Sequence, residues 1–111
     1  MAGKGGLAPK RRGDAFEAEV AADQRRFGRW CERIRQGQGE IVDLVSIEGC
    51  AHHSPTACVA PGVSHVFFIQ CRLRGNMSAV ETEQLKEEAK MYRAVPLLAW
   101  KQDGQVQYKK L

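Results

Sequence analysis

The sequence lacks any apolar run that approaches the roughly 20 residues needed to span a membrane. Residues 1–12 also lack the hydrophobic core of a secretory signal peptide. These two absences argue against a membrane-spanning or exported protein and predict a cytoplasmic one. In the cytoplasm the four cysteines, which are Cys31, Cys50, Cys58 and Cys71, are expected to be thiols or metal ligands and not disulfides.

The chain is also short and has no internal repeat. Its 111 residues provide one domain with a core of modest size and leave little room for a second core. Residues 1–12 are rich in Gly, Lys and Arg, a composition typical of a flexible basic arm. We therefore expect this arm to be followed by a single domain over residues 13–111, with a long loop at residues 49–64.

Acidic residues are absent from Lys4 to Arg12, and the formal net charge of the chain is +4. Arginine forks match phosphate oxygens, so clusters of basic residues favour a nucleic-acid partner. The candidate phosphate contacts are Lys10, Arg11, Arg12, Arg25, Arg26, Arg33, Arg35 and Arg74. On charge alone, however, a solvated basic face that keeps the protein soluble is the stronger interpretation.

Hydrophobic periodicity predicts an α/β domain with the element order α, β, β, β, α, β, β. Asp14 is a candidate cap for a first helix, in which Phe16, Val20 and Phe27 share one face and Gly28 ends the helix. The segment that follows, Trp30–Arg35, is interpreted as a strand, and continuation of the helix is the alternative.

The later elements are marked by apolar runs and turn residues. Two buried strands are expected at Glu40–Ile47 and His65–Leu73, and Ser78–Glu81 has the spacing of a capping box that opens a helix. Pro96–Lys101 and Gln105–Lys109 form a closing hairpin around an Asp-Gly turn.

Polar residues interrupt the two buried strands. Asp43 lies in the first of these strands, and Gln70 and Arg72 are two residues apart in the second, so they point to the same side. If the strands are neighbours, these side chains converge, and Glu17 approaches from the first helix. Oxygen ligands beside a cation would bind Mg²⁺ for phosphodiester cleavage. A buried Asp–Arg pair that only fixes strand register is an equally strong interpretation at this point.

These residues carry a resemblance to a known family, the archaeal Holliday junction resolvases and their phage relatives in the PD-(D/E)xK nuclease superfamily. Each motif is short, but their order and spacing together are fairly specific. The matching segments are Arg12–Glu17 (RGDAFE), Gly39–Leu44 (GEIVDL), Phe68–Arg72 (FIQCR), Glu83–Leu85 (EQL) and Ala94–Lys101 (AVPLLAWK).

The resemblance implies a restriction-endonuclease-like core, with a central mixed β-sheet flanked by helices. It assigns catalytic roles to Glu17, Asp43, Gln70 and Arg72. It also implies that Mg²⁺ or Mn²⁺ is bound by Glu17, Asp43, Gln70 and the backbone carbonyl of Cys71. Arg72 stands where the family has lysine, and a guanidinium holds its proton and cannot act as a base. Slow cleavage and loss of cleavage both remain open.

The resemblance also implies a homodimer that resolves four-way DNA junctions, gripping phosphates with its basic residues. There are two alternatives. One is another DNA repair or nicking nuclease of the same fold, and the other is a DNA-binding protein that has lost cleavage. A separate zinc site at Cys50, His52, His53 and Cys58 is considered, but their spacing matches no standard zinc finger. Ordinary loop residues are the favoured interpretation there. Trp30 and Trp100 are expected to be core or dimer contacts.

Overall fold

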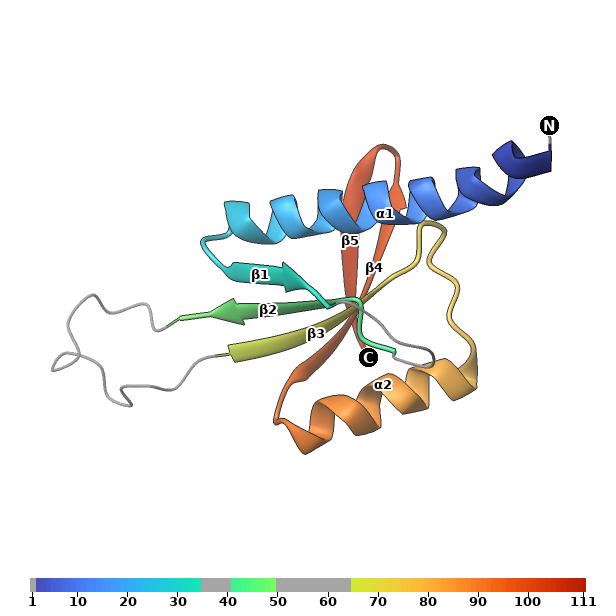
Figure 1. Cartoon of the computed structure of the whole chain (residues 1–111). Coiled ribbons are helices and arrows are strands. Elements are labelled where there is room, and N and C mark those ends of the chain that lie inside the picture. The colour runs from blue at the N-terminus through green and yellow to red at the C-terminus, as the bar shows by residue number, and fades with distance from the viewer. Residues whose placement is uncertain (1, 35–40, 50–64) are drawn as a thin grey trace, which may run out of the picture.

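A computed structural model describes the backbone of residues 2–34, 41–49 and 65–111, and the side chains of the same ranges from residue 13 onward. Its elements follow the order that the sequence predicts (Figure 1). They are α1 (Ala2–Arg26), β1 (Trp30–Arg33), β2 (Leu44–Glu48), β3 (His65–Cys71), α2 (Ala79–Met91), β4 (Val95–Gln102) and β5 (Gln105–Lys110).

The five strands form one mixed sheet in the order β1-β2-β3-β4-β5. β1, β2 and β3 pair antiparallel, as do β4 and β5, whereas β3 and β4 run parallel because α2 makes the crossover between them. Leu44 in β2 is aligned with Ile69 in β3. This register brings the start of β2 beside the end of β3, where the polar residues Asp43 and Gln70 lie.

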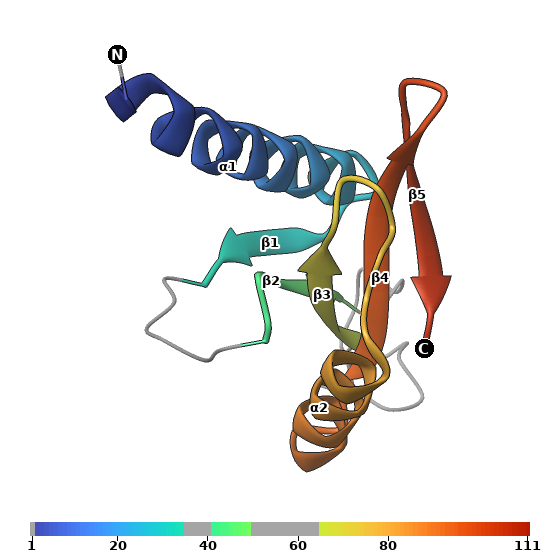
Figure 2. The same ribbon diagram turned by 90° about the vertical axis from the view of Figure 1, so that its right-hand side faces the viewer.

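The two helices cover opposite faces of the sheet, which gives a three-layer α/β arrangement (Figures 1 and 2). Phe16, Val20 and Ala21 of α1 pack on one face against side chains that include Leu44 and Ile69. On the other face, Leu85 and Ala89 of α2 pack against Val42 and Phe68. The alternation of Phe68 and Ile69 between the two cores is the period-two pattern of a central strand.

Polar contacts fix α1 on the sheet in addition to this apolar packing. The Tyr108 hydroxyl donates to Asp23 at 2.6 Å, and Lys101 pairs with Glu19 at 3.0 Å. In the interior, Ser46 donates to the Gln24 side-chain oxygen at 2.9 Å. These contacts extend along the helix, so the position of Glu17 relative to the sheet is well defined.

The first helix, α1, is longer than the helix predicted from the sequence, which begins at Asp14. Residues 2–12 continue α1 without a break and are not an irregular arm, and Asp14 lies inside the helix and not at its cap. Leu7, Ala8 and the basic residues 10–12 favour helix, and a formed helix is extended without a new nucleation step.

Three further expectations need correction. β2 begins at Leu44, so Asp43 immediately precedes the strand and does not interrupt it. Phe27 follows the end of α1 and is more than half exposed, so it does not lie in the core. Trp30 begins the edge strand β1 and is also more than half exposed, so it is not a core residue, whereas a dimer contact stays a prediction. Among the described residues, no helix is both long enough and apolar enough to cross a membrane. The proposed zinc ligands, and most of the expected loop at 49–64, lie outside the described residues.

Candidate active site

Asp43 lies at the entrance to β2 and is held by the backbone on both sides. Its N–H donates to the Ile69 carbonyl at 3.0 Å, and its carbonyl accepts from the Ile34 N–H at 2.9 Å. Its carboxylate accepts a hydrogen bond from the Cys71 N–H at 2.7 Å through Oδ2. Because Asp43 is only 8% exposed, this bond to the end of β3 fixes the carboxylate where the two strands meet.

Gln70 lies beside Asp43 and is also buried. Its amide is satisfied when the NH₂ group faces Asp43 Oδ2, 3.3 Å away, and the Ile41 carbonyl. In this orientation the amide oxygen accepts from Arg72 Nε at 3.1 Å and from Arg72 Nη2 at 3.2 Å. The sequence-based expectation that Asp43, Gln70 and Arg72 converge therefore agrees with the geometry.

Glu17 approaches the same point from α1 and faces a second acid. Burial raises the pKa of Glu17 above its ordinary value of 4.5, and the negative charge of Asp43 raises it further. The Arg33 guanidinium, 3.6 Å from the Glu17 carboxylate, opposes this shift, while Asp14 adds to it. Two carboxylates that repel each other in a partly buried site are a feature of sites that hold a cation.

The raised pKa of Glu17 predicts a pH-dependent gain in stability on its replacement. The folded protein holds the Glu17 proton more tightly than the unfolded chain, so the contribution of Glu17 to stability is full below pH 4.5 and is lost as pH rises through the folded pKa. Glu17→Gln mimics the protonated acid. At neutral pH we expect it to raise the free energy of unfolding by about 0.5–1 kcal/mol, within the range of single stabilising substitutions.

Guanidinium denaturation at a series of pH values from 4 to 8 measures this effect. The advantage of Glu17→Gln should disappear below about pH 4.5, where the parent carboxyl is protonated in both states. Ala18→Gln is the control, because it adds an amide to an exposed position of α1 without removing an acid. A gain that is constant over the whole pH range would contradict the assignment.

Arg72 follows the last residue of β3 and has a partner that sequence reasoning missed. Its Nη2 group forms an ion pair with Glu81 Oε2 in the first turn of α2. From the sequence, Glu81 is expected only in the capping box, which the structure contains: Ser78 Oγ accepts from the Glu81 N–H at 3.0 Å. The glutamate at position 81 was the available signal. Either Glu or Gln serves at this position of a capping box, so a negative charge there indicates a second role.

The donor set fits a hard cation such as Mg²⁺. Glu17 and Asp43 provide carboxylate oxygens, and Gln70 adds an amide oxygen, the ligand types that Mg²⁺ and Mn²⁺ favour. Within the described ranges, no three His, Cys, Asp or Glu side chains form a group that could hold a metal ion, so a third side-chain donor would have to be of another type, such as the Gln70 amide. For Gln70 to act as a ligand, its amide must turn, because its NH₂ group faces Asp43.

The Cys71 thiol is a poor candidate for chemistry. Burial raises its pKa far above the ordinary value, and the negative charges of Asp43 and Glu17 raise it further. The thiol therefore stays protonated and is neither a nucleophile nor a thiolate ligand. What Cys71 contributes to this region is its backbone N–H, which donates to the Asp43 carboxylate.

Several predicted phosphate contacts make contacts within the protein. Arg33 pairs with Asp14 at 3.1 Å, Arg25 donates to the Cys31 carbonyl at 2.8 Å, and Arg26 pairs with Asp23. Arg74 is exposed in the turn after β3. The side chains of Lys10, Arg11, Arg12 and Arg35 lie outside the described residues.

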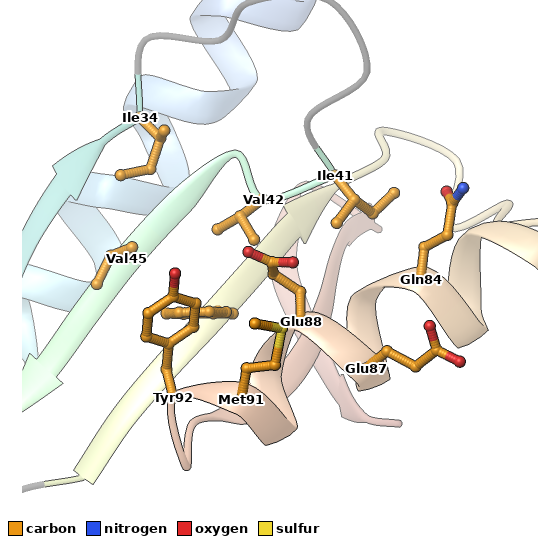
Figure 3. A pocket seen from close by; sticks show the side chains of 10 residues that line it. Ile34, Ile41, Val42, Val45, Gln84, Glu87, Glu88, Met91 and Tyr92 are labelled. Atoms are coloured by element: carbon orange, nitrogen blue, oxygen red, sulfur yellow. The ribbon is translucent and has the colours of Figure 1, made fainter.

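A groove of about 550 Å³ lies beside this cluster, between α2 and the sheet (Figure 3). Its floor is apolar and its rim carries two glutamates of α2. The lining residues are Ile34, Ile41, Val42, Val45, Phe68, Gln84, Glu87, Glu88, Met91 and Tyr92. Glu87 and Glu88 give the groove negative charge, which disfavours a phosphate backbone there.

Comparisons with known proteins support the fold. The sequence matches no protein-family model and no curated protein. Among solved structures, the chain is similar to Hjc, a Holliday junction resolvase of the hyperthermophilic archaeon Archaeoglobus fulgidus, with a TM-score of 0.62 and 19% sequence identity. The match covers 89% of this chain and 72% of the resolvase chain. The α/β fold with a mixed sheet, expected from the sequence, is therefore confirmed.

Proposed function

We propose that the protein is a metal-dependent, structure-selective endonuclease that resolves four-way DNA junctions. The observation that carries this proposal is that Asp43 contacts the Gln70 amide and lies close enough to Glu17 to raise its pKa, in a fold shared with a resolvase. A pair of carboxylates, of which Glu17 has a raised pKa, and an amide donor, placed by a helix and two adjacent strands, make a suitable cation site. An enzyme with this substrate would work inside the cell, where DNA is found.

In the proposed reaction, water attacks the phosphorus atom and one P–O bond of the DNA backbone breaks. Glu17, Asp43, the turned Gln70 amide and the Cys71 carbonyl would hold Mg²⁺ or Mn²⁺. Such a bound cation polarises the phosphate and lowers the pKa of a coordinated water. Asp43 is oriented for this role by the Cys71 N–H, which leaves it little freedom to move.

Arg72 would stabilise the negative charge that builds on the phosphate in the transition state. Its guanidinium lies next to Gln70 and is partly exposed, so it can reach a bound backbone. Because it keeps its proton, Arg72 does not accept one from the attacking water. The proton must instead pass to solvent or to a carboxylate of the cluster.

Branched DNA and a second copy of the chain are the partners that this function requires. A symmetric dimer would present two cleavage sites to opposed strands of a junction. The arginines of α1 and β1, together with Arg74, would contact phosphates and position the DNA without reading its sequence. From the sequence resemblance, we also propose that the protein is a phage relative of the archaeal enzymes.

A cleavage panel tests the proposal. Purified protein is incubated with a labelled four-way junction, a flap and a linear duplex of equal length, with Mg²⁺, Mn²⁺ or chelator. We expect metal-dependent cleavage of the junction at least about tenfold faster than that of the duplex, because binding energy from the branched shape adds to phosphate contacts. Equal cleavage of all three substrates would favour a less selective repair or nicking nuclease.

A second candidate function is a junction-binding protein that does not cut. Two observations favour it: Arg72 replaces the lysine of the family, and the Gln70 amide presents its NH₂ group to Asp43. Tight junction binding in a gel-shift titration, with no cleavage of any substrate in either metal, would support this candidate and overturn the endonuclease.

A further inference from the structure

The Arg72 side chain lies between β3 and the first turn of α2, and three contacts restrict it. Nε and Nη2 donate to the Gln70 amide oxygen, while Nη2 also pairs with Glu81. The backbone on either side is fixed as well, since the Arg72 N–H donates to the Ala99 carbonyl at 2.9 Å and its carbonyl accepts from Gly75 at 2.8 Å. Arg72 therefore has a defined position on the side of the cluster that faces α2.

Glu81 is itself immobilised, and each of its oxygens has a separate role. Oε1 accepts from the Ser78 N–H at 3.2 Å as part of the capping box, and Oε2 pairs with Arg72. The helix N-terminus also favours a negative charge at this place. A carboxylate held at both oxygens is confined to one arrangement, so the start of α2 is a rigid anchor for the guanidinium.

The contacts form a chain that runs from Glu81 through Arg72 and Gln70 to Asp43. Arg72 holds the amide oxygen of Gln70, which leaves the NH₂ group toward Asp43. When Gln70 turns its oxygen toward a cation, Arg72 loses both bonds to the amide. Only Glu81 then keeps the guanidinium beside the site, because the Glu81 contact does not depend on Gln70.

We propose that Glu81 is a positioning residue for the candidate active site, which keeps the Arg72 guanidinium beside Asp43 and Gln70 through its Oε2 atom. This inference rests on the proposed endonuclease function and adds a residue from α2 to it. It also gives a reason for arginine at position 72. A planar fork contacts the Gln70 oxygen and the Glu81 carboxylate at the same time, which the point charge of a lysine does less well.

The test is Glu81→Gln, because glutamine keeps the capping box and removes only the charge that binds Arg72. We expect kcat for junction cleavage to fall about tenfold, between the loss of a screened ion pair and that of a misplaced catalytic group. KM for the junction and the melting temperature should stay nearly unchanged. Glu83→Gln is the matched control, since it makes the same change two residues later, where the side chain pairs with Lys86.

A double substitution separates positioning from a general structural role. If Glu81 acts through Arg72, Arg72→Gln combined with Glu81→Gln should cleave no more slowly than Arg72→Gln alone. Additive losses in kcat would overturn the inference. So would a Glu81→Gln protein with full kcat, or one whose loss is matched by Glu83→Gln.

A readout without DNA keeps this inference distinct from the proposed function. Nitrogen-15 NMR of the parent should show a slowly exchanging Arg72 Nε–H signal, assigned by its loss in Arg72→Gln. That signal should broaden or exchange faster in Glu81→Gln and persist in Glu83→Gln. An unchanged signal in Glu81→Gln contradicts the positioning role even if the parent cuts junctions. A parent that never cuts contradicts the endonuclease, whereas the NMR signal still decides whether Glu81 holds Arg72 in place.

Discussion

Asp43→Asn is expected to lower four-way junction cleavage by about a thousandfold, because it removes the central negative charge from the proposed cation site. Asparagine has nearly the same shape as aspartate and keeps an oxygen that can accept the Cys71 N–H, so the junction of β2 and β3 should remain intact. Junction binding, measured by gel shift in chelator, should stay within about threefold, since phosphates and not Asp43 dominate the affinity.

Asp103→Asn is the matched control for this experiment. It removes the same charge from an exposed turn whose backbone has a φ of 52°, a conformation that asparagine tolerates. Cleavage by the control should equal that of the parent. If Asp43→Asn cuts junctions as fast as the parent, Asp43 is not the centre of the active site and the assignment of the cluster is wrong.

Leu85→Ala should destabilise the fold by about 3 kcal/mol, within the range for removal of a large buried aliphatic side chain. Leu85 is fully buried and packs α2 against Val42 and Phe68, so the smaller residue leaves a cavity between helix and sheet. Because Val42 precedes Asp43 and α2 carries Glu81, the candidate active site should also lose order before the protein unfolds. Guanidinium denaturation followed by circular dichroism measures the loss.

Val80→Ala, on the exposed side of the same helix, separates burial from helix propensity. We expect its free energy of unfolding to lie within about 0.5 kcal/mol of the parent, as for other surface substitutions. A similar loss in both variants would mean that Leu85 does not anchor α2 in solution.

The strand pattern and its polar residues could be predicted because they follow local rules. Alternating apolar residues and the Asp103–Gly104 turn place the strands, and Ser78 with Glu81 gives the start of α2. The convergence of Asp43 with Gln70 needs only that β2 and β3 are neighbours, which is the usual outcome for consecutive strands.

The parts that could not be predicted depend on contacts between distant segments. The acidic partners of Arg33 are Asp14 and Glu17, nineteen and sixteen positions earlier in the chain, and no local pattern distinguishes this arginine from one that contacts phosphate. The pairing of Arg72 with Glu81 depends on how α2 docks on the sheet. The start of α1 was also predicted wrongly, because Asp14 is a good cap by type but lies inside a helix that begins at Ala2.

The outer strand β5 ends with Lys109 and Lys110, both exposed, and lies at one margin of the sheet. An exposed edge strand has unpaired backbone N–H and C=O groups that can pair with an extended segment of another chain. Lysines on the edge strand disfavour this strand addition by charge and by the cost of desolvation. A continuous ribbon built from many copies is therefore discouraged at this side. Addition of a second copy through the backbone of β5 is disfavoured for the same reason.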